Sequence, residues 1–192
     1  MKSHHHYIAY KPYGYLSQFI ANGKVKQKHR YLGELHDFAE GTMSIGRLDY
    51  KSEGLLLLTT NGKISHEINS NKFEKEYWVQ VDGEITPIAL FDIRSGIDIK
   101  LQNGSMYRTK PCQIERIKDP RFPERNFKKV RDDRHGPSTW IRVVIKEGKF
   151  RQVRKMTAAV GFPTLRLVRV RVGRWTLDGL GVGSVQEVQE LI

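Results

Sequence analysis

Hydrophobic and polar residues alternate in several stretches of the chain, which is the pattern of β-strands with one buried face. Three such stretches are KEYWVQVDG (residues 75–83), WIRVVIKEG (140–148) and LRLVRVRVG (165–173). KPYGYLSQF (11–19) indicates a strand that enters a Pro-Tyr-Gly turn. The unbroken run from Leu55 to Leu58 indicates a buried strand. The pattern therefore predicts a sheet as the main element of the fold.

Helical periodicity is confined to short segments. KISHEINS (63–70) fits a short helix after an Asn-Gly turn, and Thr86-Pro87 marks the start of a second helix, because proline is favoured at the first helical position. FRQVRKMTAAVGF (150–162) has the apolar stripe of a third helix. Ser184 and Glu187 fit a capping box, so we expect a last short helix there.

The order of these elements indicates the fold class. Residues 97–117 are expected to form strands joined at Asn103-Gly104, which is the strongest short signal for a hairpin. Strands outnumber helices, and the helices are scattered between hairpins. We therefore expect an α+β fold with a mixed, mainly antiparallel sheet and flanking helices.

Charge narrows the range of binding partners. The chain of 192 residues has 33 lysines and arginines against 21 acidic residues, a formal net charge of +12. Such a surplus causes self-repulsion unless a polyanion relieves it, so nucleic acid is the first candidate partner and an anionic membrane surface the second. Residues 118–137 contain seven basic and four acidic residues and three prolines. We expect a long, mobile, basic loop there, which carries the aromatic Phe127 and could close over a bound strand.

The positive charge is densest between Lys149 and Arg174, where eight basic residues occur without an acid. Such a run is usually a solvated face balanced by acids from elsewhere, but we favour a surface that binds a polyanion, because arginine predominates and binds phosphate through two hydrogen bonds. Two sets are expected to face outward, one on a helix and one on a strand. They are Arg151, Arg154 and Lys155, and Arg169 and Arg171.

Several classes of protein are disfavoured by composition. No apolar run approaches the roughly 20 residues that span a bilayer, and the N-terminus lacks the apolar middle of a secretory signal. Cys112 is the only cysteine, which excludes an intrachain disulfide and a cysteine-cluster metal site. His4 to His6 are more typical of a disordered terminus or a purification tag than of a metal site, so we assign them no role. A soluble cytoplasmic protein of one domain, built as two lobes, is expected.

Asp49 is the acidic residue of most interest. It precedes a strand that we expect to be buried, and a carboxylate is unfavourable in a protein that binds a negatively charged substrate unless it has a function. In GRLDYKSEGLLLLTTNG (46–62) it follows Arg47 by two positions. It could simply cap a turn or pair with Arg47. Alternatively, nearby guanidinium groups would keep its carboxylate ionised, and an ionised carboxylate can serve as a nucleophile or as a metal ligand. Glu53 is its only close acidic neighbour in the sequence, and metal chemistry on phosphate normally needs several carboxylates, so a metal-free mechanism is the simpler interpretation.

GRLDYKSEGLLLLTTNG resembles the active-site motif of the RsuA-type pseudouridine synthases. KEYWVQVDG resembles their tyrosine motif, EGKFRQVRKMTAAVGFPTLRLVRVRVG (147–173) their third motif and KPYGYLSQF their first strand. The similarity covers nearly the whole chain. YLSQF, the basic loop and VGFPTLRLVR are most similar to a branch that modifies one uridine of large-subunit ribosomal RNA and lacks the N-terminal S4-type RNA-binding domain of many relatives.

The resemblance implies the pseudouridine synthase fold with a central cleft, one catalytic domain over residues 1–192 and isomerisation of a uridine in large-subunit ribosomal RNA. It implies no cofactor and no metal. Asp49 would be the nucleophile, attacking either the base or the sugar. Tyr77 would pack on the uracil and could remove the C5 proton, and Arg154 would pair with the nucleophile. Arg47 would enter the space that the target base leaves.

The same resemblance indicates which basic residues contact RNA. Lys149 stands where many relatives have arginine, so the charge is kept and the planar fork is lost. We expect RNA contacts from Arg47, Lys149, Arg151, Lys155, Arg169 and Arg171. We expect a monomer without a small-molecule cofactor or a membrane partner.

Two alternatives remain open from the sequence. A non-catalytic, ribosome-associated RNA-binding protein could keep the same fold, although it would not need Asp49, Tyr77 and Arg154 together. A metal-dependent nuclease could use Asp49 and Glu53.

Overall fold

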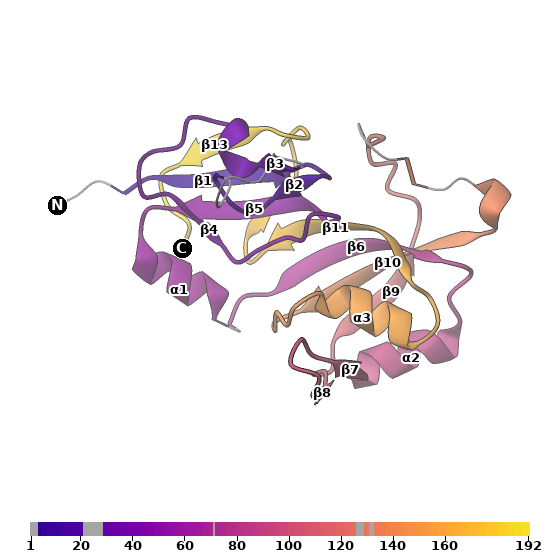
Figure 1. The fold of residues 1–192 in the computed structure, drawn as a ribbon. Coiled ribbons are helices and arrows are strands. Elements are labelled where there is room, and N and C mark those ends of the chain that lie inside the picture. Colours follow the sequence, from indigo (N-terminus) through magenta and orange to yellow (C-terminus); the bar gives the residue numbers. More distant parts are fainter. Residues whose placement is uncertain (1–3, 21–28, 71, 126–128, 131–132) are drawn as a thin grey trace. The chain divides into compact units, whose positions relative to one another are not determined.

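The structure is a computed structural model that describes residues 4–20, 29–70, 72–125, 129–130 and 133–192. The chain divides into two compact units. Unit 1 comprises Met1–Phe73 with Arg169–Ile192, and unit 2 comprises Glu74–Val168. The chain passes from unit 2 back into unit 1 within strand β11 (Thr164–Val172). Figure 1 shows the elements of each unit.

Unit 1 is built on a sheet with the strand order β13-β1-β5-β11. β1 pairs antiparallel with both β5 and β13, and Tyr7 lies opposite Leu58 and Glu187. The short strands β2 and β3 pair in parallel. The bounds of the unit 1 elements are β1 His6–Lys11, β2 Tyr15–Leu16, β3 Arg30–Tyr31, β4 Met43–Ile45, β5 Glu53–Thr59, β12 Trp175–Thr176, β13 Val185–Val188, helix α1 Gly62–Asn69 and 3-10 helix η1 Leu32–Glu34.

The leucine run forms strand β5, as predicted, and its side chains fill two apolar clusters. Leu55 and Leu57 pack with Ile68 of α1, whereas Leu56 and Leu58 pack with Tyr7. Successive side chains of a strand point to opposite faces, so a run without polar interruptions is what a strand covered on both faces requires. β5 is therefore a rigid base for the loop that precedes it.

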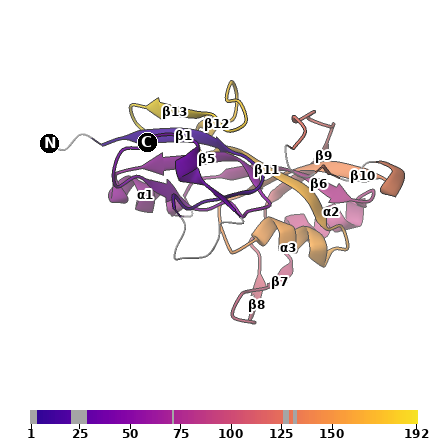
Figure 2. The same cartoon turned by 45° about the horizontal axis from the view of Figure 1, so that its top comes forward.

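Unit 2 has the strand order β11-β6-β10-β9, and β10 pairs antiparallel with β6 and β9. Tyr77, Val79 and Val81 of β6 are buried, whereas Trp78 and Gln80 between them are partly exposed, which confirms the predicted alternation. Helices α2 and α3 lie on the same side of this sheet in Figures 1 and 2. The bounds are β6 Lys75–Asp82, β7 Asp98–Lys100, β8 Met106–Arg108, β9 Gln113–Ile117, β10 Ser138–Ile145, α2 Pro87–Ser95, α3 Gln152–Ala159 and 3-10 helix η2 Asp133–His135.

Three of the four predicted helices and the predicted hairpin are confirmed. The Asn61 side chain accepts hydrogen bonds from two backbone N–H groups at the start of α1, and the Thr86 hydroxyl caps α2, with Pro87 as its first residue. β7 and β8 form the predicted hairpin around Gly104, whose φ is +85°. The α+β fold with a mainly antiparallel sheet is therefore confirmed.

The helix predicted from Ser184 and Glu187 is wrong, because Val185–Val188 is strand β13. The backbone oxygen of Ser184 accepts a hydrogen bond from the N–H of Tyr10, and Gly183 donates to Tyr10 in return. Pairing with β1 therefore outweighs the local capping signal.

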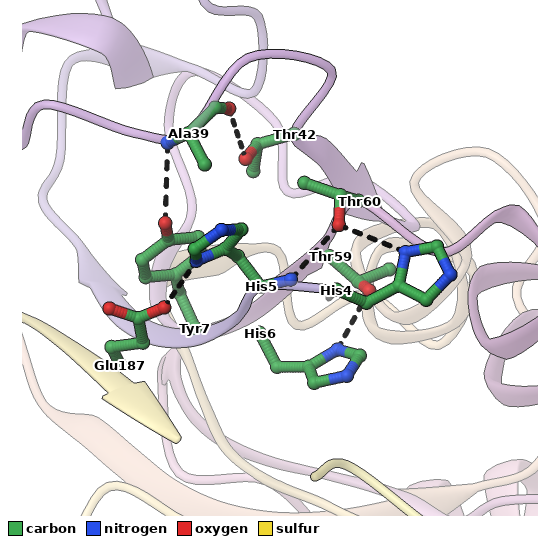
Figure 3. Close-up of polar contacts among 9 residues, drawn as sticks. All are labelled: His4, His5, His6, Tyr7, Ala39, Thr42, Thr59, Thr60 and Glu187. Atoms are coloured by element: carbon green, nitrogen blue, oxygen red, sulfur yellow. Dashed lines mark hydrogen bonds and ion pairs between the residues drawn. The ribbon is translucent and has the colours of Figure 1, made fainter. Parts of the chain in front are cut away.

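His4 to His6 are part of the folded unit, so the expectation of a disordered terminus is wrong. His6 begins β1, and its Nδ1 lies 2.8 Å from the Thr59 hydroxyl. His5 forms a 2.7 Å contact with the Glu187 carboxylate across the β1–β13 pair. Figure 3 shows these contacts. Burial, the largest cause, together with the two neighbouring histidines lowers the pKa of His6.

None of the helices described here is long and apolar enough to cross a membrane.

Candidate active site and RNA-binding surface

The loop before β5 carries Asp49, and several hydrogen bonds within unit 1 fix its backbone. The Ser17 hydroxyl donates to the Leu48 oxygen at 2.8 Å and accepts from the Leu48 N–H at 3.0 Å. The backbone oxygen of Asp49 accepts a hydrogen bond from the Ser52 N–H at 2.9 Å, which closes a turn. The Gly14 N–H donates to the backbone oxygen of Tyr50 at 2.9 Å. These bonds join the first strand motif to the aspartate motif.

Residues of this loop alternate between burial and exposure. Leu48 is 6% exposed and anchors the loop in the core, whereas Arg47 is exposed and Asp49 is partly exposed. The buried leucine thus holds its two charged neighbours at the surface of unit 1. The loop presents a carboxylate and a guanidinium group on a fixed backbone.

Buried charges lie beside this loop. Lys11 is fully buried, and its Nζ donates to the backbone oxygens of Pro12 at 2.9 Å and Tyr15 at 2.7 Å. Burial lowers the pKa of Lys11 to about 7, although the negative charges of Glu53 and Asp49 act in the opposite direction. In its protonated form, Lys11 therefore interacts favourably with the negative charges of Glu53 and Asp49. Glu53 is only 2% exposed, which does not suit the surface metal site of a nuclease.

Tyr77 and Arg154 lie in unit 2. Tyr77 is 9% exposed and lies opposite Val143 in the β6–β10 pair, on the buried face of the strand. Arg154 is partly buried on α3, and its Nη1 lies 3.5 Å from the Thr164 oxygen. Asp49 and Arg47 belong to unit 1, so the pairing of Asp49 with Arg154 stays a prediction.

A buried carboxylate organises the turn before α3. Glu147 is 3% exposed, and it accepts hydrogen bonds from the Tyr107 hydroxyl at 2.5 Å, from the Lys110 N–H at 2.9 Å and from the Gln152 amide. Gln152 in turn accepts from the Lys149 N–H at 2.9 Å. The hydrogen bond to Glu147 is the largest cause that raises the pKa of Tyr107. Glu147 thereby joins the turn to the segment that follows β8.

Arg151, Arg154 and Lys155 were expected on one side of a single helix, but Arg151 lies outside α3. Arg151 precedes the helix as its N-cap in the left-handed conformation, with φ +52°, so it does not share the helical geometry of Arg154 and Lys155. Lys149 is exposed, with its Nζ 4.7 Å from the centre of the Tyr107 ring. Lys155 donates to the Lys100 oxygen at 2.6 Å.

The two arginines of β11 do not share an exposed face, and this part of the sequence prediction is wrong. Arg169 is 4% exposed, and its Nε donates to the Leu55 oxygen at 2.7 Å. Gly54 lies so close that a Cβ atom there would stand 2.3 Å from the Arg169 oxygen. β11 is covered on the face that alternation assigned to solvent. Arg171 is partly exposed and donates to the Gly173 oxygen at 3.1 Å.

The described part of the basic loop begins with a fixed segment. The Phe122 ring lies 5.7 Å from the ring of Trp78 and 5.8 Å from that of Trp140. Arg166 lies over Phe122 at 5.4 Å and donates to the Pro123 oxygen at 2.9 Å. Trp78 follows Tyr77 in the strand, so this cluster covers the opposite face of the unit 2 sheet. Phe127 lies outside the described residues.

Sequence reasoning missed two residues of this region, Lys11 and Glu147. Both stand inside motifs that were singled out, KPYGYLSQF and EGKFRQVRKM. Tyr107 and Lys110 donate to Glu147 from 40 and 37 residues away, and the charge of Lys11 interacts with that of the distant Glu53. For Lys11 the available signal was a charged residue at the end of a largely apolar strand, whereas Glu147 lies two residues beyond β10.

Comparisons with known proteins agree with the motifs. The profile of the family described as RNA pseudouridylate synthase matches residues 5–159. A protein of Vibrio vulnificus named ribosomal large subunit pseudouridine synthase E is 42% identical over 93% of this chain and 72% of its own length. A protein of the same name from Xanthomonas axonopodis pv. citri is 42% identical over 88% of this chain and 86% of its own length.

A solved structure gives the same result at the level of the fold. A crystal structure described as pseudouridylate synthase has a TM-score of 0.77 and 25% identity, and the match covers 98% of this chain and 71% of that chain. The family profile covers both the Asp49 loop and the turn before α3. The chain therefore belongs to the RNA pseudouridylate synthase family.

Proposed function

We propose that the protein isomerises a specific uridine of large-subunit ribosomal RNA to pseudouridine. The observation that carries this proposal is the similarity to two proteins named ribosomal large subunit pseudouridine synthase E, at 42% identity over 93% and 88% of the chain. The fixed loop that presents Asp49 gives the proposal a chemical basis, because it combines a partly exposed carboxylate with an exposed arginine.

The reaction is an isomerisation that rearranges bonds within one nucleotide. The bond from N1 of uracil to C1′ of ribose breaks, the uracil turns, and a bond forms from C5 to C1′. C5 loses a proton and N1 gains one, so no group enters or leaves. The chemistry therefore requires a nucleophile, a proton acceptor and a means of holding the free base, all of which amino-acid side chains can supply.

Asp49 is the nucleophile in this proposal. A carboxylate attacks only when it is ionised, and the Asp49 side chain is partly exposed on its fixed loop. The hydrogen bonds of Ser17 to Leu48 keep the neighbouring backbone in place. A fixed nucleophile needs less reorganisation on the way to the transition state.

Tyr77, Arg154 and Arg47 have supporting roles. Tyr77 packs on the uracil and is the candidate for accepting the C5 proton. In this proposal, Arg154 is the arginine that pairs with Asp49 and orients its carboxylate. Arg47, which is exposed beside the nucleophile, enters the space that the flipped nucleotide leaves, since a stacked base cannot be reached without extrusion.

RNA contacts come from the exposed and partly exposed basic residues. Extruding a base costs a few kcal/mol, which contacts to phosphate offset. Lys149, Arg151, Lys155 and Arg171 are the candidates, because their side chains reach the surface. Arg169 is buried and is not among them.

We assign these roles to one catalytic domain, residues 1–192, that works as a monomer in the cytoplasm, where ribosomal RNA is made and assembled. A purely RNA-binding protein with the same fold is the alternative that the experiment must exclude.

The test is to incubate the protein with an unmodified transcript of large-subunit ribosomal RNA and to map pseudouridine by carbodiimide treatment and reverse transcription. We expect one new reverse-transcription stop, at the modified uridine, that appears only when the protein is present. The stop should also appear when EDTA is added to remove metal ions. Tight binding without any new stop, on free transcript and on assembly intermediates alike, would show an RNA-binding protein instead.

A further inference from the structure

Phe150 is an aromatic residue to which the proposed function assigns no role. It is 48% exposed, although a phenylalanine ring is normally buried. Single exposed apolar residues are common on protein surfaces, so exposure alone carries no functional meaning. Phe91 of α2, at 63% exposure in the same unit, is such a case. The surroundings of Phe150 are what distinguish the two rings.

The ring of Phe150 lies among positive charges. Lys149 and Arg151 flank it in the sequence, and the Lys155 Nζ lies 5.4 Å from its ring centre. Residues 149–174 contain no acid. A cation over an aromatic face is a favourable arrangement that also keeps positive charge beside the ring. The surface around Phe150 thus combines a half-exposed aromatic ring with groups that attract phosphate.

The backbone on which Phe150 stands is fixed. The Gln152 N–H donates to the Lys149 oxygen at 3.0 Å, and the Lys149 N–H donates to the Gln152 side chain at 2.9 Å. These two bonds close the turn from 149 to 152 in both directions. The buried Glu147 then binds the Gln152 amide. Phe150 is therefore presented from a rigid turn at the start of α3, which lowers the entropic cost of using it in binding.

We infer that Phe150 is a base-stacking residue, on which an unpaired nucleotide of the RNA substrate packs. This inference rests on the proposed function. Every base has a π-face, and the phosphates on either side of a stacked base require nearby positive charge, which Lys149 and Arg151 supply. An enzyme that extrudes one nucleotide also disturbs its neighbours, and a protein ring can replace part of the lost stacking.

The experiment measures the Kd of the protein for the transcript used in the activity assay, with Phe150→Ala, Phe150→Leu and Phe150→Trp. Loss of one stacked base should raise the Kd by about 5- to 150-fold. We expect this loss for alanine and leucine, and near-normal binding for tryptophan. Phe91→Ala is the matched control for removal of an exposed ring and should leave the Kd unchanged.

The salt dependence of binding separates stacking from charge. Phe150→Ala should leave the slope of log Kd against log salt unchanged, because no phosphate contact is lost, whereas Lys149→Ala should flatten it. A Kd for Phe150→Ala within twofold of the wild type overturns the inference, as does full retention of affinity by Phe150→Leu or an equal loss in Phe91→Ala. A wild-type protein that forms no pseudouridine contradicts the proposed function instead, and the binding results remain a separate test.

Discussion

Replacement of Glu147 by alanine should destabilise unit 2 strongly. The carboxylate is 3% exposed and accepts three hydrogen bonds, from Tyr107, Lys110 and Gln152. A hydrogen bond to a charged group contributes about 1.5–3 kcal/mol, and a buried donor left without a partner costs about 1–3 kcal/mol. Water can reach part of the opened space, so we expect a loss of about 3–5 kcal/mol rather than the full sum.

Glu147→Gln gives an intermediate test of the same network. It keeps the volume of the side chain, but its amide nitrogen cannot accept the bond from one of the three donors. We expect a loss of about 1–2 kcal/mol. Glu84→Ala, at an exposed glutamate of the same unit, is the control and should change stability by less than about 0.5 kcal/mol.

Urea denaturation followed by circular dichroism measures these differences. Since the network also holds the turn of Lys149 and Phe150, the glutamine variant should bind RNA more weakly in conditions where it is fully folded. A loss below about 1 kcal/mol for Glu147→Ala would refute the reasoning that this carboxylate organises the turn.

Three further predictions concern unit 1. Lys11 loses its proton near pH 7 in the folded state and near pH 10.5 when unfolded. Between these two pH values the unfolded chain binds more protons than the folded one, so the wild type gains stability as the pH rises. Its free energy of unfolding minus that of Lys11→Met should increase by up to about 1.4 kcal/mol per pH unit from pH 7 to 9 in denaturation experiments. A difference that does not change with pH contradicts this prediction. Gly54→Ala should cost more than about 4 kcal/mol or prevent folding, because the methyl group meets the Arg169 backbone; soluble, stable protein with wild-type Tm contradicts this. Ser17→Ala should remove about 1–3 kcal/mol and lower kcat through the loosened Leu48 backbone; an unchanged kcat would mean that this bond does not position Asp49.

Local signals predicted much of the fold. The short helix after Asn61, the helix start at Thr86-Pro87, the Asn103-Gly104 hairpin and the leucine strand depend on residues that are close in sequence, and all are confirmed. The failures are positions where a distant segment decides. Ser184 resembles a helix cap, but pairing of the following residues with β1 makes a strand.

Alternation shows which face of a strand is apolar, but not whether the other face is also covered. Arg169 illustrates this, because β11 lies beside β5 and the buried Arg169 side chain donates to the Leu55 oxygen. The site residues were found through motifs rather than through periodicity. Lys11 and Glu147 were missed because their burial, and the hydrogen bond from Tyr107 to Glu147, depend on the tertiary fold.

The most direct test of the account compares Asp49→Asn with the wild type, measuring pseudouridine formation and RNA affinity on the same transcript. The substitution keeps the shape of the side chain and removes its charge and nucleophilicity. We predict binding within a few-fold of the wild type and no detectable pseudouridine. Turnover at the wild-type rate by Asp49→Asn would contradict the assignment of this carboxylate as the nucleophile.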